Sequence, residues 1–192
     1  MRTFIAVEIP AEVKEKIGLY VDSMQNSFQN VKWVAPENLH LTLKFLGEVK
    51  EDDVESLVEC MKPIFSEFRS FELALEHTGF FPTSVNPRVI WIGSDGGADI
   101  LLDIFQELEH CLESIGIDRE ARMFSPHLTI GRVKRNNKQS DQSVVNVDIP
   151  EFEPVSFTVG NIALIKSTLT PQGPIYEKLF EGKLKEAQFG MV

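Results

Sequence analysis

The sequence predicts an α+β fold built from two similar halves, and three observations lead to this prediction. Each half contains one tetrapeptide of the form histidine, apolar residue, threonine, apolar residue, at 40–43 and 127–130. Each tetrapeptide lies in a run of alternating side chains, which is typical of a half-buried strand. The predicted order is strand, helix and strands, followed by helix and strands again. With no linker between the halves, we expect residues 1–192 to form a single compact bilobed domain.

The first half is expected to contain two helices among several strands. Alternation predicts strands at 3–9, 31–34, 39–46, 71–76 and 88–93, and amphipathic periodicity predicts helices at 11–28 and 51–68. Pro10 ends the first strand, and Pro63 is expected to kink or shorten the second helix. The segment 79–87 contains two prolines and is predicted to be a loop.

The second half repeats this order. A helix is predicted at 98–115, with Gly116 as its C-terminal cap. Strands are expected at 127–134, 155–159, 161–167 and 175–180, and the polar segment 135–143 is expected to be a loop or a short helix.

Composition limits the possible functions. The chain has 192 residues, of which 43% are hydrophobic and 25% charged, and its formal net charge is −10. Such an acidic protein does not suit broad binding of duplex DNA, which requires many Lys and Arg side chains against phosphates. Cys60 and Cys111 do not make a disulfide framework and are expected to be free, buried thiols in helices. No signal peptide or membrane-spanning run is recognisable, so we expect a cytoplasmic protein without a membrane partner.

The two tetrapeptides point to acid–base chemistry on a phosphodiester. On a strand, His40 and Thr42 share one face, as do His127 and Thr129. An imidazole titrates near pH 6.5, so at neutral pH one histidine can accept a proton while the other donates one. Threonine hydroxyls can donate hydrogen bonds to phosphoryl oxygens. No cluster has metal-ligand spacing, so neither a metal nor another cofactor is expected.

The contexts of both motifs resemble those of a known family. Residues 33–47 and 124–133 are similar to the two signatures of the 2H phosphoesterase superfamily, and within it to the RNA 2′,3′-cyclic phosphodiesterases, also described as 2′–5′ RNA ligases. Residues 3–10 and 173–176 resemble the first strand and the C-terminal element of that family. The resemblance implies two mostly antiparallel sheets that line a central cleft, with helices outside.

The resemblance also implies residue roles and a substrate. His40 would be the proton donor and His127 the proton acceptor, and the phosphate-binding residues would be Thr42, Thr129 and Arg132. The implied reaction opens the 2′,3′-cyclic phosphate of an RNA end, such as a tRNA fragment, or of a cyclic nucleotide, and yields a 2′-phosphomonoester. We expect a monomer that does not bind DNA.

Two residues implied by the resemblance conflict with simple alternation. Phe45, a candidate contact for the base, and Arg132 each follow a motif histidine by five positions. An odd spacing places a side chain on the opposite face of a strand. A bulge at Gly131 could turn Arg132 to the histidine face. Near Phe45, Gly47 is the only residue in the sequence that suggests a similar irregularity of the strand.

Other interpretations stay open from the sequence. The same fold could form a non-catalytic module that binds RNA ends or nucleotides, or it could join RNA ends through a 2′–5′ bond as a side activity. The basic run that begins at Arg132 fits a solvated surface as well as an RNA-backbone contact. Core packing is the expected role of the remaining large aromatics, Phe80, Phe81, Trp91 and Tyr176, and a surface position is expected for His77 and His110.

Overall fold

The structure is a computed structural model that describes residues 1–25, 28, 30–134 and 149–187. Its strands are β1 (Arg2–Glu8), β2 (Val31–Trp33), β3 (His40–Glu48), β4 (Phe71–Phe81), β5 (Val89–Ser94), β6 (His127–Val133), β7 (Val155–Val159), β8 (Asn161–Thr170) and β9 (Gly173–Lys183). Its α-helices are α1 (Ala11–Gln25), α2 (Val54–Phe65) and α3 (Ala98–Ser114), and two 3₁₀ turns are η1 (Pro36–Asn38) and η2 (Glu51–Asp53).

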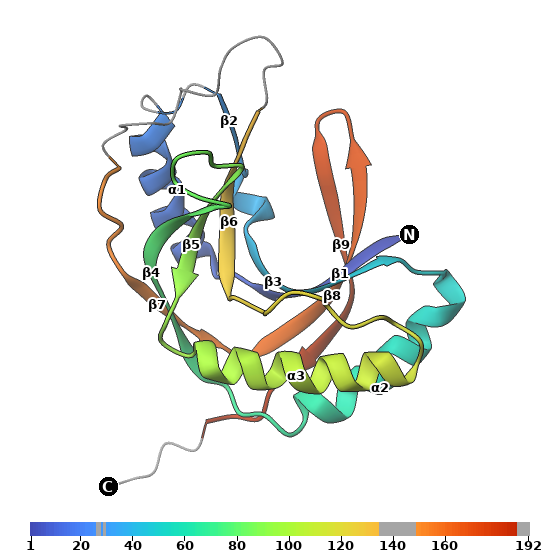
Figure 1. Ribbon diagram of the computed structural model, residues 1–192. Coiled ribbons are helices and arrows are strands. Elements are labelled where there is room, and N and C mark those ends of the chain that lie inside the picture. Colours follow the sequence, from blue (N-terminus) through green and yellow to red (C-terminus); the bar gives the residue numbers. More distant parts are fainter. Residues whose placement is uncertain (26–27, 29, 135–148, 188–192) are drawn as a thin grey trace, which may run out of the picture.

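The named strands form one antiparallel sheet with the order β7-β4-β5-β6-β3-β1-β8-β9, and β2 pairs with the far part of β6. The two expected sheets are the two arms of this sheet. They are joined where β3 meets β6 through the single residue pair Leu41 and Leu128. From this junction the β8–β9 hairpin and the β2–β6 ladder diverge (Figure 1). The predicted α+β architecture is therefore confirmed, with one motif strand on each side of the junction.

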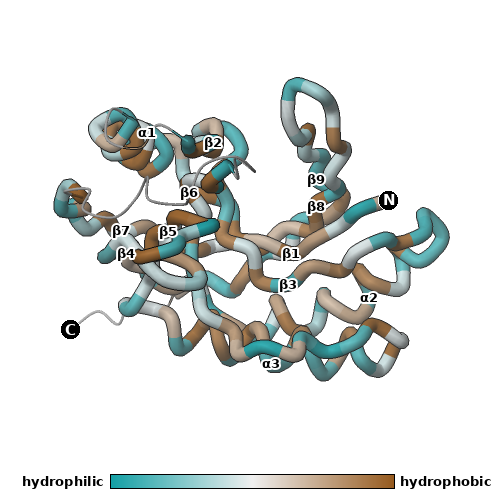
Figure 2. Tube along the Cα trace, turned by 45° about the horizontal axis from the view of Figure 1, so that its top comes forward, coloured by the Kyte–Doolittle hydropathy of each residue, from teal (hydrophilic) through white to brown (hydrophobic). Residues whose placement is uncertain are grey.

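The helices pack on the face of the sheet that holds the main core. Helix α2 contacts α3 and β9, and α3 contacts β3. On the other arm, the Tyr20 hydroxyl of α1 lies 2.7 Å from the Thr78 hydroxyl of β4. Hydrophobic and hydrophilic residues alternate along α3, as expected for a helix with one buried side (Figure 2). A second, small cluster on the opposite face contains Phe4, Ala6, Ala163 and Ile165, with Tyr176 packed against it.

Most predicted elements are present, and the differences lie at their ends. Strand β4 extends to Phe81 instead of ending near residue 76, because residues 77–81 pair with β5. The predicted helix 51–68 is divided into η2 and α2, and Pro63 lies inside the last turns of α2. Gly116 has a φ of 88°, which agrees with its predicted place after α3. The segment 135–143 lies outside the described residues.

The prediction of two free, buried thiols is wrong. Cys60 of α2 and Cys111 of α3 form a disulfide, with their Cα atoms 5.9 Å apart, and both residues are half-buried. The sequence shows only that each cysteine lies in a helix. The pairing depends on how α2 and α3 pack, which spacing along the chain does not reveal. The cysteines therefore no longer argue for a reducing compartment, and the cytoplasmic location stays a prediction. Among the described residues, no helix has both the length and the apolar character needed to span a bilayer.

Candidate active site

The pairing of β3 with β6 brings the two tetrapeptides together. Leu41 lies opposite Leu128, and both side chains are fully buried in the core. The antiparallel register then places His40 across from Thr129, and His127 across from Thr42. Residues directly opposite in such a pair have Cβ atoms about 4.5–5.5 Å apart, and diagonal neighbours are about 7–8 Å apart. The two imidazoles are diagonal neighbours on one face, so this spacing leaves room for a small tetrahedral group between them.

Bulges place the residue five positions after each histidine on the same face as that histidine. In the pairing of β1 with β3, Ala6 lies opposite Thr42 and Ile5 opposite Lys44, so that Leu43 is the extra residue. Consequently two successive residues, Leu43 and Lys44, point into the core, and Phe45 returns to the histidine face with 59% of its surface exposed.

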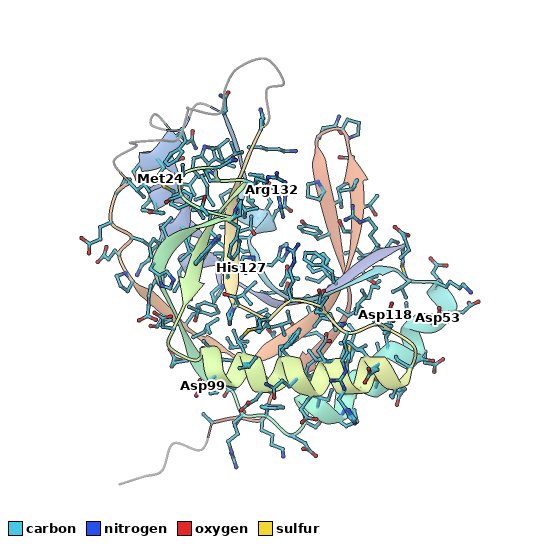
Figure 3. All side chains as sticks on the ribbon, in the orientation of Figure 1. Met24, Asp53, Asp99, Asp118, His127 and Arg132 are labelled. Carbon is cyan, nitrogen blue, oxygen red and sulfur yellow. A yellow bond between two sulfur atoms is a disulfide. The ribbon has the colours of Figure 1, made fainter. Side chains whose placement is uncertain are left out.

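Strand β6 has the same irregularity. Trp91 of β5 lies opposite Thr129, and Ile90 lies opposite Gly131, which leaves Ile130 as the extra residue. Ile130 and Gly131 are both buried, and the exposed Arg132 follows. Arg132 lies farther from α3 along β6 than His127 does (Figure 3). A bulge is therefore present next to Gly131, with Ile130 as the extra residue, and the matching bulge at Leu43 is a feature that alternation alone does not reveal.

Each histidine ring is fixed by the same local hydrogen bond. The Nδ1–H of His40 donates to the carbonyl of Asn38 over 2.7 Å, and the Nδ1–H of His127 donates to the carbonyl of Ser125 over 2.7 Å. Because a carbonyl can only accept, Nδ1 must carry the hydrogen in both rings. Each Nε2 is therefore left to accept a proton when the ring is neutral and to donate one when it is charged.

Aromatic rings surround His40. Phe4 stacks on its imidazole at a centroid distance of 4.7 Å, and Tyr176 meets it edge-on at 5.2 Å. Phe4 and Tyr176 also contact each other at 5.3 Å. Tyr176 thus packs as expected, but its packing partner is a motif histidine.

A second aromatic group surrounds His127. Phe81 lies 5.0 Å and Trp91 6.1 Å from its ring centroid, and the two aromatic rings stack on each other at 4.9 Å. The indole N–H of Trp91 is buried and has no partner among the described residues. Sequence reasoning assigned both residues to the core. Their place beside His127 depends on the pairing of β4 with β5 and of β5 with β6, and the sequence analysis predicted no strand pairing that could have revealed it.

Nearby cations act on His40. Burial lowers the pKa of His40, the hydrogen bond to Asn38 opposes this effect, and the charges of Lys14 and Arg132 lower the pKa further. The Nζ of Lys14 also donates to the carbonyl of Glu37, 3.2 Å away. Burial raises the pKa of Tyr176, while Arg132 and Arg2 lower it. These groups show that positive charge from β1, α1 and β6 acts on the histidine face, although the whole chain is acidic.

A buried ion pair supports the site from the core side. Lys44 is 2% exposed and forms an ion pair with Glu109 of α3. Its Nζ also donates to the carbonyl of Asp118 over 2.8 Å, and Glu109 accepts the backbone N–H of Glu120 over 2.8 Å. The pair therefore connects β3 to the segment that leads from α3 to His127.

The other two histidines do not belong to the paired motifs, although His77 lies in the same row of the sheet as His127, because Gly93 of β5 pairs with both. His110 is exposed on α3, as predicted. His77 is exposed but belongs to strand β4, and its Nδ1 lies 3.6 Å from Asp95. Within the described ranges, no three His, Cys, Asp or Glu side chains gather as metal ligands would.

The architecture and the repeated motifs can be compared with known proteins. The model of the LigT-like phosphoesterase family matches the chain twice, over residues 7–91 and 92–176. The chain belongs to this family. Each match includes one motif strand of the phosphoesterase, so the duplication inferred from the sequence corresponds to the two matched halves. The resemblance to 2H phosphoesterases is thereby confirmed.

This chain is similar to curated relatives and solved structures over almost its whole length. It is 36% identical over 181 residues to the RNA 2′,3′-cyclic phosphodiesterase of Thermotoga maritima, with 94% of each chain covered. It is 39% identical over 186 residues to the protein of that name from Methanocaldococcus jannaschii, covering 94% of this chain and 99% of the relative. The structure of TT0787 from Thermus thermophilus matches with a TM-score of 0.77 at 29% identity, over 97% of this chain and 99% of the other. The structure of E. coli LigT complexed with 3′-AMP matches with a TM-score of 0.74 at 26% identity, over 95% and 97%.

Proposed function

We propose that this phosphoesterase opens the 2′,3′-cyclic phosphate at an RNA end by general acid–base catalysis, without a metal ion, and leaves a 2′-phosphomonoester. The observation that carries the proposal is the β3–β6 pairing, whose register gives His40, Thr42, His127 and Thr129 one common face of the sheet. The names of the curated relatives support the choice of substrate.

The reaction requires one proton to be removed and one to be supplied. His127 Nε2 takes a proton from water as the water oxygen attacks phosphorus. The bond from phosphorus to O3′ breaks, and O3′ takes the proton carried by His40 Nε2. The 2′ ester bond stays intact, so the product is the 2′-phosphate. After the turnover His127 is charged and His40 neutral, and exchange with solvent restores both.

The negative charge of the phosphate is stabilised by the remaining site residues. The hydroxyls of Thr42 and Thr129 donate to the non-bridging oxygens, and the Arg132 guanidinium lies on the same face. The base of the terminal nucleotide stacks on Phe45.

The lowered pKa of His40 fits the donor role once substrate is bound. In the free enzyme, burial and the charges of Lys14 and Arg132 favour the neutral ring. A bound phosphate brings negative charge beside the same groups and favours the protonated ring. Substrate binding therefore favours the protonated form of His40, which supplies the proton that the leaving oxygen requires.

The test uses an RNA oligonucleotide that ends in a 2′,3′-cyclic phosphate, incubated in EDTA with the wild type and with His40→Asn or His127→Asn. We expect the wild type to release a 2′-phosphate end, identified by chromatography, and each variant to lose about 10²–10⁴-fold in rate. His110→Asn is the matched control, because His110 is exposed on α3 and away from the site.

Other outcomes point to other functions. A 3′-phosphate product would reverse the choice of leaving oxygen. Loss of activity in EDTA would show a metal requirement. RNA that is bound but never cleaved would indicate a binding module, and a joined product would indicate 2′–5′ ligation.

A further inference from the structure

An unusual pair of like charges lies next to the candidate active site. Lys32 of β2 pairs directly with Arg132 of β6, and both side chains are exposed. Directly opposed residues share a face of the sheet, so Lys32 points to the same side as the motif histidines. Like charges in this arrangement destabilise a sheet.

No neighbouring acid among the described residues offsets this repulsion. The other cross-strand neighbour of Arg132 is Val89 of β5. Neither Lys32 nor Arg132 has a carboxylate within ion-pair distance in the part of the chain that the structure describes. The chain has 29 acidic and 19 basic residues, so an unneutralised basic pair on this face runs against its overall composition.

Of the two cations, Lys32 is the one that lies beyond the terminal phosphate. Arg132 follows His127 by five residues along β6, but its guanidinium acts on the site, since its charge lowers the pKa of His40, and Lys32 is not among the charges that act on His40. Lys32 lies across from Arg132 on β2, along the same edge of β6 that pairs with β3. An anion held by Lys32 is therefore different from the group held between the two histidines. In an RNA substrate, the next anion is a phosphodiester of the chain leading to the terminal nucleotide.

We infer that Lys32, next to Arg132 at the edge of the site, holds a backbone phosphate upstream of the cyclic end, so that the enzyme acts on RNA chains in preference to cyclic mononucleotides. This inference rests on the proposed function. The repulsion between the two cations is relieved when the terminal phosphate neutralises Arg132 and the upstream phosphate neutralises Lys32, and a cyclic mononucleotide has no group to place on Lys32.

A second reading of Lys32 is that its charge protects the short edge strand β2 from pairing with other chains. That role requires a charge on β2 but no contact with substrate. Kinetics on two substrates separates the two readings.

The experiment compares a hexaribonucleotide ending in a 2′,3′-cyclic phosphate with adenosine 2′,3′-cyclic monophosphate. For Lys32→Gln we expect kcat/KM on the hexamer to fall by about fivefold, the upper end of what an exposed ion pair contributes. On the mononucleotide kcat/KM should stay unchanged. The slope of log kcat/KM against log salt on the hexamer should become shallower by about 0.7, the value for one phosphate contact on a single strand. Lys32→Arg should retain the wild-type preference. Lys50→Gln, an exposed lysine beside η2, is the control.

The melting temperature gives a further readout, since removing one of two repelling charges should not lower it. Equal losses on both substrates, or no loss on either, would overturn the inference. If the wild type cleaves neither substrate, the proposed function has failed. The anion site is then judged by fluorescence anisotropy with a labelled hexamer that ends in a 2′-phosphate. Weaker binding by Lys32→Gln would support the site, and equal binding would refute it.

Discussion

Phe45 and Arg132 occupy the same structural position in the two halves of the protein. Each follows a motif histidine by five residues, and each returns to the histidine face because a bulge turns two successive residues into the core. The halves differ in the second of these buried residues, which is Lys44 in β3 and Gly131 in β6. The same kind of bulge thus places an aromatic ring, Phe45, on the histidine face of one half and a cation, Arg132, on the histidine face of the other.

Gly131→Ala should disturb the second bulge. A Cβ added at Gly131 would lie 2.7 Å from Val31 Cγ1 and 2.9 Å from Trp33 Cε3, so these two side chains of β2 must move. We expect the free energy of unfolding, measured with urea, to fall by about 1–3 kcal/mol, and kcat/KM to fall because Arg132 moves with the strand. Gly160→Ala is the control, since nothing lies within 4 Å of a Cβ there. Equal stability of the two variants would contradict the packing argument.

Lys44→Met should be strongly destabilising. It leaves the carboxylate of Glu109 buried without its cation and removes a donor from the Asp118 carbonyl. Breaking a buried ion pair in this way costs about 3–5 kcal/mol, which urea unfolding would measure. The double variant Lys44→Met/Glu109→Leu should recover part of the loss, because no charge is then buried alone.

An exposed ion pair provides the comparison for Lys44. Lys62 and Glu59 of α2 are 51% and 63% exposed in their side chains, so Lys62→Met should change the free energy of unfolding by less than about 1 kcal/mol. If Lys44→Met were no more destabilising than Lys62→Met, the support that the buried pair gives to β3 would have to be abandoned.

Phe45→Ala should raise KM for an RNA end while changing the free energy of unfolding only slightly. With 59% of its surface exposed, the ring contributes about 1 kcal/mol or less to folding. Stacking on a base is worth about 1–3 kcal/mol, so KM for an RNA end should rise several-fold or more. Ribose 2′,3′-cyclic phosphate, which has no base, should show no such rise. Leu19→Ala, at a residue of α1 that is 73% exposed, controls for the loss of exposed apolar surface.

The protonation of His40 can be measured directly by NMR titration. We expect its pKa in the free enzyme to lie below the ordinary value of about 6.5, first because of burial and then because of Lys14 and Arg132. Lys14→Gln removes one of these charges and should raise the pKa. Since a donor must be protonated, the inflection that His40 gives to the pH dependence of kcat/KM should then move to higher pH. Lys16→Gln, an exposed neighbour on α1, should leave it in place. A wild-type pKa at or above 6.5 would refute this account.

The spacing of apolar residues along the chain was sufficient to predict most strands and helices. It was also sufficient to place each motif histidine on the same strand face as its threonine. Alternation placed His40 with Thr42, and the anchoring of β3 by Leu41 follows from the same pattern. What could not be predicted depends on contacts between distant segments. The bulge before Phe45 is set by the partner strand β1, and the rings around His127 come from β4 and β5. The disulfide likewise depends on the packing of two helices.

The antiparallel junction at Leu41 and Leu128 has a consequence for symmetry. Two antiparallel strands are related by a two-fold axis, which is also the relation between subunits in an isologous dimer. Two identical half-length chains joined through such a strand would already present two imidazoles and two hydroxyls on one face. They would, however, carry the same side chain at both fifth positions. Covalent linkage of the halves is what permits a ring on one flank and a guanidinium on the other, so that the two ends of the histidine face differ.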